Sequence, residues 1–340
     1  MFWKTIGLVG LALGLSIGTA QAQKEFGSDE LIAAAKKEGR LVFYTANFAE
    51  IEQEVIKAFN KRFPEIKVEM VRAPGGQLIT RFKTEAAANK LAADIMSHSD
   101  RGLMKQIADM FQEYAPPNAA DYRPDALVAP NLWPAVTLGW GISYNAALVK
   151  NAPKTWADLT KPEYKGKLIG QVVGPSGGTT WTRSMFERQV LGEDYWAKQA
   201  ALGIALYPSG APTADAMVRG EIEIAPLLYN IAFLKAKEGA PVETVFPPEG
   251  VPTVPYAEGL TKASKNPNAA KLFLNWRLSE EGQKVLINEL GHITSLKNPP
   301  AYPKGWDPQK VKVWLPNFEQ FESLRKAWLE EWNKTYNYRQ

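Results

Sequence analysis

Cysteine is absent from this chain of 340 residues. The protein therefore forms no disulfide, and it has no thiol to carry the lipid by which exported lipoproteins are anchored. A chain of this length can bury enough apolar surface to fold without cross-links. We therefore expect a protein that is not membrane-anchored and that owes its stability to packing alone.

Histidine is nearly absent as well, since the chain has only His98 and His292. Two histidines far apart in the sequence, with no cysteine and no H-E-x-x-H pattern, do not build a structural zinc site or a zinc-protease site. We predict no resident metal and no cofactor. A site made of carboxylate and tyrosine oxygens stays open as an alternative.

A large excess of charge of one sign is also missing. The chain has 40 basic and 36 acidic residues, a formal net charge of +4, and no dense block of lysine or arginine. This balance argues against a nucleic-acid partner. Beyond the N-terminal segment, no run of eighteen uninterrupted apolar residues occurs, which is the length that predicts a transmembrane helix.

The N-terminal segment has the three parts of a secretory signal peptide. Lys4 supplies the positive charge, residues 6–17 are apolar and uncharged, and Ala20 and Ala22 are the small residues that signal peptidase requires. The apolar run is too short to span a bilayer. We predict that residues 1–22 are a signal peptide, that cleavage follows Ala22, and that the protein is periplasmic.

The rest of the chain alternates between strand and helix patterns, and the alternation begins again near the middle. This order predicts an α/β fold with two lobes, each a mostly parallel sheet flanked by helices. Expected strands are 41–45, 67–72, 93–96, 138–144, 167–173, 204–207, 221–228 and 242–246. Expected helices are 29–37, 50–63, 77–89, 101–110, 179–191, 213–219, 229–238, 268–278, 280–290 and 316–332.

The segment 174–180, which reads GPSGGTT, joins an expected strand to an expected helix. Its glycines leave backbone N–H groups uncovered at a helix N-terminus, and Ser176, Thr179 and Thr180 add hydroxyl groups. Such a loop binds phosphate, phosphonate, sulfate or carboxylate groups. On local sequence alone, a plain tight turn capped by serine or threonine is an equal alternative.

The same segment also matches G-x-S-x-G, the nucleophile elbow of serine hydrolases. In that hypothesis Ser176 is the nucleophile of a secreted esterase and His292 is its base, with Asp215, Glu243 or Glu258 as the acid. The restart of the chain as a second lobe disfavours it, because a hydrolase builds one large sheet. A capping or surface role is the alternative for His292. We therefore expect no enzyme and no catalytic residues.

Several other side chains are expected near a cleft between the lobes. Trp140, Trp181 and Tyr229 stand at strand ends or helix starts, where they can stack on an organic ligand or simply pack in the core. Possible charge partners for an anion are Arg72, Arg101 and Arg183, for which a solvated surface position is an equal alternative.

Segments along nearly the whole chain after residue 22 resemble the periplasmic solute-binding proteins of ABC importers, and above all the ferric-iron-binding group. The matching pieces are LVFYT at 41–45, GGQL at 75–78, AADI at 92–95 followed by SHS, GEIEIA at 220–225 and NPNAAKLF at 266–273. The resemblance implies the type II periplasmic-binding fold, with a ligand cleft between two lobes. It implies a small-molecule ligand and an inner-membrane permease as partners, and we expect a monomer.

The resemblance also implies a domain division and a site. Crossover strands are expected near 139–144 and 254–259, which gives lobe 1 as 23–138 with 258–295, lobe 2 as 139–257, and a C-terminal helical tail over 296–340. Ser176, Gly177 and Gly178 would hold an anion, as the matching loop does in iron-binding relatives. The remaining expected ligand-binding residues are Thr179, Thr180, Trp140, Tyr229, Asn47, Phe48, Gly76 and Ser99.

The chain departs from the iron-binding pattern at its metal ligands. Iron-binding members have adjacent tyrosines where this chain reads Leu228-Tyr229-Asn230, and their histidine and glutamate ligands fall on Phe48 and on or beside Ser99. Ferric iron needs several anionic oxygen ligands. We therefore predict a small organic anion as ligand, namely a carboxylate, phosphonate or phosphate ester. Ferric iron or a metal–anion complex is the alternative.

Overall fold

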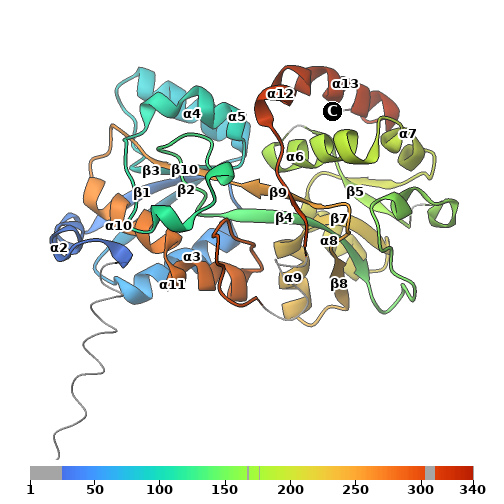
Figure 1. Cartoon of the computed structure of the whole chain (residues 1–340), viewed down its shortest axis with the longest axis horizontal. Coiled ribbons are helices and arrows are strands. Elements are labelled where there is room, and N and C mark those ends of the chain that lie inside the picture. Colours follow the sequence, from blue (N-terminus) through green and yellow to red (C-terminus); the bar gives the residue numbers. More distant parts are fainter. Residues whose placement is uncertain (1–24, 167, 176, 303–310, 340) are drawn as a thin grey trace, which may run out of the picture.

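The chain folds into two α/β lobes that lie side by side and are joined by crossing strands (Figure 1). The structure is a computed structural model that describes residues 25–166, 168–175, 177–302 and 311–339. The expected signal peptide, residues 1–22, and the expected site residue Ser176 lie outside the described residues. None of the described helices is long and apolar enough to cross a membrane.

Lobe 1 is built on a four-stranded sheet with the order β10-β3-β1-β2. Strands β1 (Arg40–Thr45), β2 (Lys67–Arg72) and β3 (Ile95–His98) are parallel, and β10 (Ala257–Leu260) runs antiparallel to β3. The parallel β-α-β order expected from the sequence is confirmed. Its helices are α2 (Asp29–Glu38), α3 (Ala49–Arg62), α4 (Gly75–Ala87), α5 (Arg101–Gln106), α10 (Pro267–Leu278) and α11 (Glu280–Lys284).

Local chemistry explains where the first helices begin and end. The hydroxyl of Ser28 accepts a hydrogen bond from Leu31 N–H (3.2 Å) at the start of α2, and Gly39 ends that helix in the left-handed region (φ 66°). Helix α3 buries Ile51, Val55 and Phe59, which are four residues apart on one face, against the lobe 1 sheet.

Lobe 2 has a mixed sheet, which corrects the expectation that both sheets are mostly parallel. The long strand β4 (Thr137–Asn145) enters from lobe 1 and pairs with three neighbours. It runs antiparallel to each of them, so the sheet is not mostly parallel. These neighbours are β7 (Ile224–Leu228), β8 (Val242–Val245) and β9 (Val251–Pro255). Parallel pairing is kept between β5 (Gly170–Val172) and β6 (Ala205–Tyr207).

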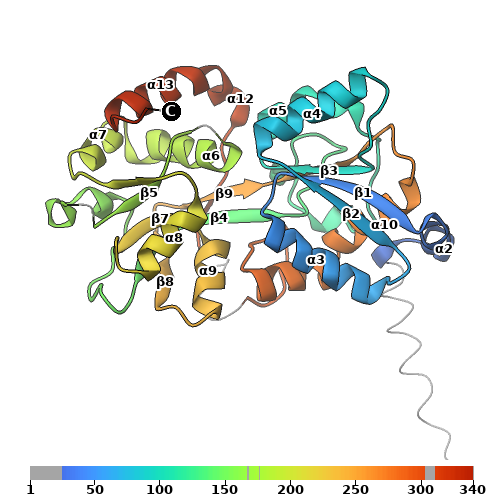
Figure 2. The same cartoon turned by 180° about the vertical axis from the view of Figure 1, so that it is seen from behind.

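The helices of lobe 2 cover both faces of this sheet (Figure 2). They are α6 (Gly178–Phe186), α7 (Tyr195–Ala200), α8 (Gly210–Val218) and α9 (Tyr229–Lys237). A π-helical turn (Glu187–Leu191) continues α6, and another (Val285–Glu289) continues α11, so each expected long helix is divided. Short 3-10 turns lie at Ala108–Met110, Ala119–Asp121, Pro124–Ala126, Ala157–Thr160 and Pro162–Tyr164.

Two strands carry the chain between the lobes. β4 pairs with β9 through residues Thr137–Gly139 and Thr253–Pro255, and β9 continues through Tyr256 into β10 of lobe 1. Figures 1 and 2 both show β4 and β9 crossing the middle of the molecule. We propose residues 139–257 as lobe 2, because both of these boundaries then fall at the crossover.

The C-terminal segment is not entirely helical. After residue 311 it forms β11 (Val313–Trp314), which pairs parallel with β9, and then α12 (Phe318–Phe321), a 3-10 turn (Glu322–Leu324) and α13 (Arg325–Thr335). It lies along lobe 2 and brings α12 to α5 of lobe 1 (Figure 1). The strand depends on pairing with a distant segment, and the expected helix 316–332 gave no indication of it.

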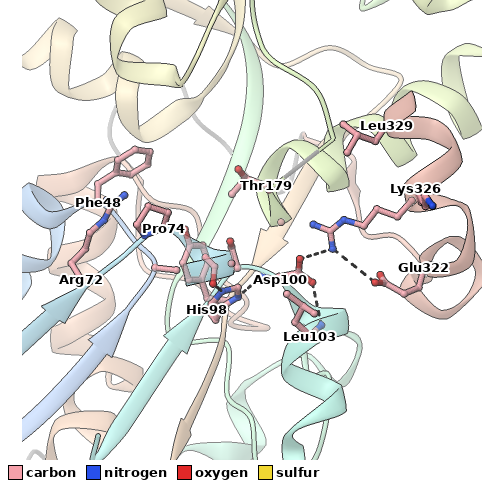
Figure 3. A pocket seen from close by; sticks show the side chains of 18 residues that line it. Phe48, Arg72, Pro74, His98, Asp100, Leu103, Thr179, Glu322, Lys326 and Leu329 are labelled. Carbon is pink, nitrogen blue, oxygen red and sulfur yellow. Dashed lines mark hydrogen bonds and ion pairs between the residues drawn. The ribbon is translucent and has the colours of Figure 1, made fainter. Parts of the chain in front are cut away.

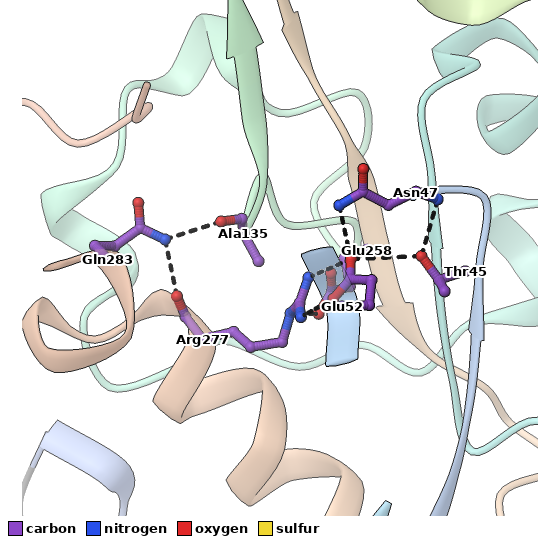
Figure 4. Close-up of polar contacts among 7 residues, drawn as sticks. All are labelled: Thr45, Asn47, Glu52, Ala135, Glu258, Arg277 and Gln283. Atoms are coloured by element: carbon purple, nitrogen blue, oxygen red, sulfur yellow. Dashed lines mark hydrogen bonds and ion pairs between the residues drawn. The ribbon is translucent and has the colours of Figure 1, made fainter. Parts of the chain in front are cut away.

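A buried charged cluster lies in lobe 1 close to the crossover (Figure 4). Arg277 on α10 contacts Glu52 at 2.7 and 3.2 Å and Glu258 on β10 at 2.9 Å, and all three side chains are fully buried. Asn47 donates its amide N–H to the same Glu52 (3.0 Å). Burial raises the pKa of Glu258 to about 7, against the opposing effect of Arg277. The cluster therefore joins Asn47, in the loop after β1, to β10, the strand that directly follows the crossover strand β9.

Candidate functional site

A cavity of about 720 Å³ lies between the lobes (Figure 3). A volume of this size suits a small organic molecule. Its walls come from four parts of the chain: the loops after β1, β2 and β3 with the helix starts that follow them, the start of α6, Tyr256 between β9 and β10, and the C-terminal segment. The lining residues are Ala46, Phe48, Arg72, Pro74, Gly75, Gly76, His98, Ser99, Asp100, Leu103, Gly177, Gly178, Thr179, Tyr256, Glu322, Arg325, Lys326 and Leu329.

Lobe 1 lines the cavity at the carboxyl ends of its parallel strands, where open α/β sheets bind ligands. Phe48 follows β1, is partly buried, and borders the cavity with its ring (Figure 3). Arg72 ends β2, and its Nε donates to the backbone oxygen of Asn47 (3.2 Å). This hydrogen bond holds an exposed guanidinium beside the Phe48 ring. The two residues offer a positive charge and an apolar surface side by side.

His98, at the end of β3, fixes the shape of this wall. Its Nδ1 accepts from the Asp100 N–H (2.9 Å), so the ring proton is on Nε2, which donates to the Gly75 oxygen (2.9 Å). Burial lowers the pKa of His98, with a smaller lowering by Arg325, so the ring is neutral near pH 7. The imidazole therefore ties the loop before α4 to the loop before α5.

Lobe 2 contributes the start of α6. The Thr180 hydroxyl accepts from the Gly177 N–H (3.2 Å), so this donor already has a partner within the loop. The expectation that Gly177 points its N–H at an anion is therefore wrong for this structure. The amide N–H groups of Gly178 and Thr179 belong to the first turn of α6, where a helix has no acceptor of its own for them, and both residues border the cavity. The Trp140 indole N–H holds this turn by donating to the Thr179 oxygen (3.1 Å).

The start of α6 meets lobe 1 directly. A Cβ placed on Gly178 would lie 2.7 Å from the Asp100 nitrogen and from the Ser99 carbonyl carbon and oxygen. No side chain fits there without moving backbone. The close approach therefore requires glycine at this position and brings the amide end of α6 against the Ser99–Asp100 loop.

The expected site residues are brought together in part. Phe48, Gly76, Ser99, Gly177, Gly178 and Thr179 line the cavity; Trp140 and Thr180 line a smaller adjoining space of about 180 Å³ that shares Phe48, Gly177 and Thr179. Asn47 is fully buried and lines neither space, because its side chain turns to Glu52.

Tyr229 and two of the arginines lie elsewhere. Tyr229 packs on Phe246 (ring centroids 5.1 Å) and lines a separate groove with Phe233 and Asn288. Trp181 is core, packed against Trp328. Arg101 and Arg183 are buried rather than solvated: Arg101 donates to backbone, and Arg183 pairs with Glu187 (3.1 Å) beneath the Trp140 ring.

Several lining residues were missed from the sequence. His98 stands in the polar SHS triplet after β3, and its place at a strand end was a usable signal. Tyr256 and the C-terminal Glu322, Arg325, Lys326 and Leu329 carried no such signal, because their position depends on how the tail returns across the lobes.

Among the described residues, none of the partners that the esterase hypothesis needs is paired with His292, and its nucleophile Ser176 lies outside those residues. His292 is fully buried, which corrects the surface role considered for it, and neither ring nitrogen has a hydrogen-bond partner among the described residues. Burial, with a contribution from Arg277, lowers its pKa to about 3. The candidate acids are engaged elsewhere: Asp215 with Lys235, Glu243 with Tyr144, and Glu258 with Arg277.

A metal centre is likewise not assembled in the part of the chain that the structure describes. No group of three or more histidine, aspartate or glutamate side chains is placed there to hold a metal ion. The charged groups bordering the main cavity are Arg72, Arg325 and Lys326 against Asp100 and Glu322, and Asp100 pairs with Arg325 (2.6 Å).

Curated relatives cover most of the chain. An uncharacterized protein of Haemophilus influenzae is 29% identical over 325 residues, which cover 88% of this chain and 91% of that protein. A putative 2-aminoethylphosphonate-binding periplasmic protein of Salmonella paratyphi A is 24% identical over 79% of this chain and 83% of its own.

Solved structures of other proteins share the fold of this chain. The periplasmic binding protein AfuA from Actinobacillus pleuropneumoniae, with fructose-6-phosphate bound, has a TM-score of 0.71 at 24% identity, covering 88% of this chain and 99% of its own. Iron-bound HitA from Pseudomonas aeruginosa has a TM-score of 0.68 at 20% identity, covering 88% and 97%. The expected two-lobed type II periplasmic-binding fold is thereby confirmed.

Residues 45–284 match the family described as bacterial extracellular solute-binding protein. That match covers more than half of the chain and spans both lobes. The chain therefore belongs to the bacterial extracellular solute-binding proteins, the periplasmic substrate-binding components of ABC transporters.

Proposed function

We propose that this protein captures a small organic anion in the interlobe cavity and delivers it to an inner-membrane permease. One observation carries the proposal: the N-terminal amides of α6 and the Arg72 guanidinium border the same cavity from opposite lobes. Both favour a negative group, and an anion bound between them would draw the lobes together.

The surroundings of this anion position support a ligand with an organic body. Phe48 borders both the main cavity and the adjoining space, which also has apolar walls from Trp140, Leu228 and Ile231. An aliphatic or aromatic part of the ligand would desolvate there, while its charged end meets Arg72 and Gly178. Two of the four similar proteins, named for a phosphonate and solved with a sugar phosphate, support a ligand of this chemical type, whereas HitA was solved with iron.

Two glycines in one turn provide a matched test. Gly178→Ala puts a methyl group 2.7 Å from lobe 1 backbone, whereas a Cβ on Gly177 meets only the Thr180 hydroxyl, at 3.7 Å. Native mass spectrometry of the purified protein identifies a retained ligand. Calorimetric titration with it, or with 2-aminoethylphosphonate, fructose 6-phosphate and a diamine as probes, gives the affinities.

We expect an anion to bind and the diamine not to bind. Gly178→Ala keeps its N–H, but its methyl group must push the start of α6 away from the Ser99–Asp100 backbone and so move this N–H off the anion. Binding should therefore weaken by about tenfold or more, the size expected for losing a charge-assisted hydrogen bond. Gly177→Ala should stay within about twofold, since it keeps the N–H donor and meets no close contact. Selective binding of the diamine, or equal affinity in a folded Gly178→Ala protein, would contradict the proposal.

We also propose that ferric iron is not the physiological ligand. Phe48 stands where the iron-binding pattern has histidine, and Tyr229, the remaining tyrosine of the expected pair, packs on Phe246 in a separate groove. Iron binding through tyrosinate gives a visible charge-transfer band. A coloured protein holding stoichiometric iron after purification would overturn this proposal, and iron retained only together with a bound anion would support the metal–anion alternative.

A further inference from the structure

The C-terminal segment from Val313 to Tyr336 is fastened to lobe 2 at both of its ends. At its start, β11 pairs with β9 through Val313 and Val251. At its end, Trp332 is fully buried and its ring stacks on that of Tyr336, with the ring centroids 4.4 Å apart. The Tyr336 hydroxyl donates to the side-chain oxygen of Gln199 on α7 of lobe 2 (3.0 Å). The segment must therefore move with lobe 2.

Between these ends, the segment reaches across to lobe 1. Arg325 contacts Asp100 (2.6 Å), with side-chain exposures of 19% and 5%, so the pair is largely shielded from water. Glu319 pairs with Lys105, and the Arg101 guanidinium lies over the Phe318 ring at 5.1 Å.

The lobe 1 residues that the segment contacts all belong to helix α5 or to its N-cap residue Asp100. The packing there is close, because a Cβ on Gly102 of α5 would lie 2.8 Å from the Glu322 carboxylate. Arg325 and Asp100, which form this ion pair, both border the ligand cavity, and Figure 3 shows Asp100 at its edge. The contact is therefore a bridge between the lobes beside the cavity.

We propose that the segment Val313–Tyr336 is a latch that holds the two lobes closed through the Arg325–Asp100 ion pair. Lobe closure in such two-lobed folds is a hinge motion, here about the crossing strands β4 and β9. Because the latch is fixed to lobe 2, any motion that draws α5 away from α6 must part Arg325 from Asp100. This inference concerns the lobes themselves and does not depend on which ligand the cavity takes.

The pair is strong enough to shift the balance between open and closed lobes. A charge-assisted hydrogen bond shielded from water is worth more than an exposed pair, which contributes little. Losing Arg325–Asp100 should therefore raise the open-to-closed ratio by roughly tenfold or more. The exposed Lys105–Glu319 pair should matter far less, since salt screens it.

The absence of cysteine allows a direct measurement in the whole chain. Lys83→Cys on α4 and Ala201→Cys after α7 place one spin label on each lobe at exposed positions. Double electron–electron resonance then gives the distribution of distances between the lobes without added ligand. The variants are Arg325→Gln and Asp100→Asn, because asparagine preserves the N-cap of α5.

Glu331→Gln is the matched control. It removes an ion pair of the same helix α13, with Arg188 (2.8 Å), that stays within lobe 2. We expect Arg325→Gln and Asp100→Asn to add a longer-distance population, the double variant to add no more than either single change, and the control to match the parent. Unchanged distances in both latch variants, or an equal shift in the control, would overturn the latch.

Discussion

Replacing Arg277 by methionine tests whether the buried charged cluster stabilises lobe 1. Arg277 pairs with Glu52 and Glu258 at 2.7 to 3.2 Å, and the three side chains have no exposed surface. Methionine fills a similar volume but leaves two carboxylates buried without their cation. Removing one member of a buried ion pair typically costs about 3–5 kcal/mol of unfolding free energy, and we expect a loss of that size at pH 8.

Arg277→Met should lower the free energy of unfolding less at pH 5 than at pH 8. Burial raises the pKa of Glu258 to about 7 even though Arg277 opposes the rise, so removing the arginine raises this pKa further. The variant therefore gains more stability than the parent when Glu258 takes up its proton between pH 8 and pH 5. A protonated carboxyl needs no cation, and the loss at pH 5 should be smaller by about 1 kcal/mol or more.

Urea unfolding followed by tryptophan fluorescence at pH 8 and pH 5 measures both effects. The control is Arg219→Met, which removes an equally short pair with Glu221 (2.6 Å) whose side chains are about half exposed (57% and 51%). Exposed pairs contribute at most about 1 kcal/mol. A loss below about 1 kcal/mol for Arg277→Met at pH 8, or the same loss at both pH values, would refute the reasoning.

Three further predictions concern pH, the site and export. Burial lowers the pKa of His292 to about 3, so on acidification the unfolded chain takes up this proton at a higher pH than the folded protein does. The free energy of unfolding is therefore unaffected above pH 6.5 and falls as the pH drops toward 3, by up to roughly 4–5 kcal/mol. His292→Phe should flatten the pH dependence of urea unfolding in that window. Trp140→Phe removes the hydrogen bond to the Thr179 oxygen and should weaken anion binding in calorimetry by about two- to tenfold, whereas Trp156→Phe, whose indole N–H bonds Gly250 away from the cavity, should not. Intact-mass measurement of the exported protein should give a chain beginning at Gln23, and a mass that retains residues 1–22 would contradict cleavage after Ala22.

The elements nearest the lobe 1 site were predictable because local patterns determine them. β1 and β2 follow apolar runs and alternation, and α3 follows a four-residue apolar spacing, so their order alone indicated strand ends that meet at one edge. The loop before α6 was found from its glycines, and its closeness to lobe 1 is a contact that the sequence does not reveal.

What was missed depends on contacts between distant segments. The antiparallel pairing of β4 arises from its entry out of lobe 1, and the return of the C-terminal segment depends on aromatic packing of Trp332 into lobe 2. Tyr229 follows a strand end, as expected, but its ring packs toward Phe246 and not toward the cavity. Strand ends indicate where a residue lies along the sheet, and they do not specify which way its side chain turns.

The contact between Gly178 and the Ser99–Asp100 loop has a consequence for how such a protein can change over evolution. The two lobes approach each other there through main-chain atoms, so this one contact depends on glycine at position 178 and not on the side chains that line the cavity. Phe48 and Arg72 line the cavity without taking part in this contact, so under the proposed function a change at Phe48 would alter the surface offered to the ligand and leave the contact in place. We therefore expect Gly178 to vary less among related proteins than the cavity-facing side chains of Phe48 and Arg72.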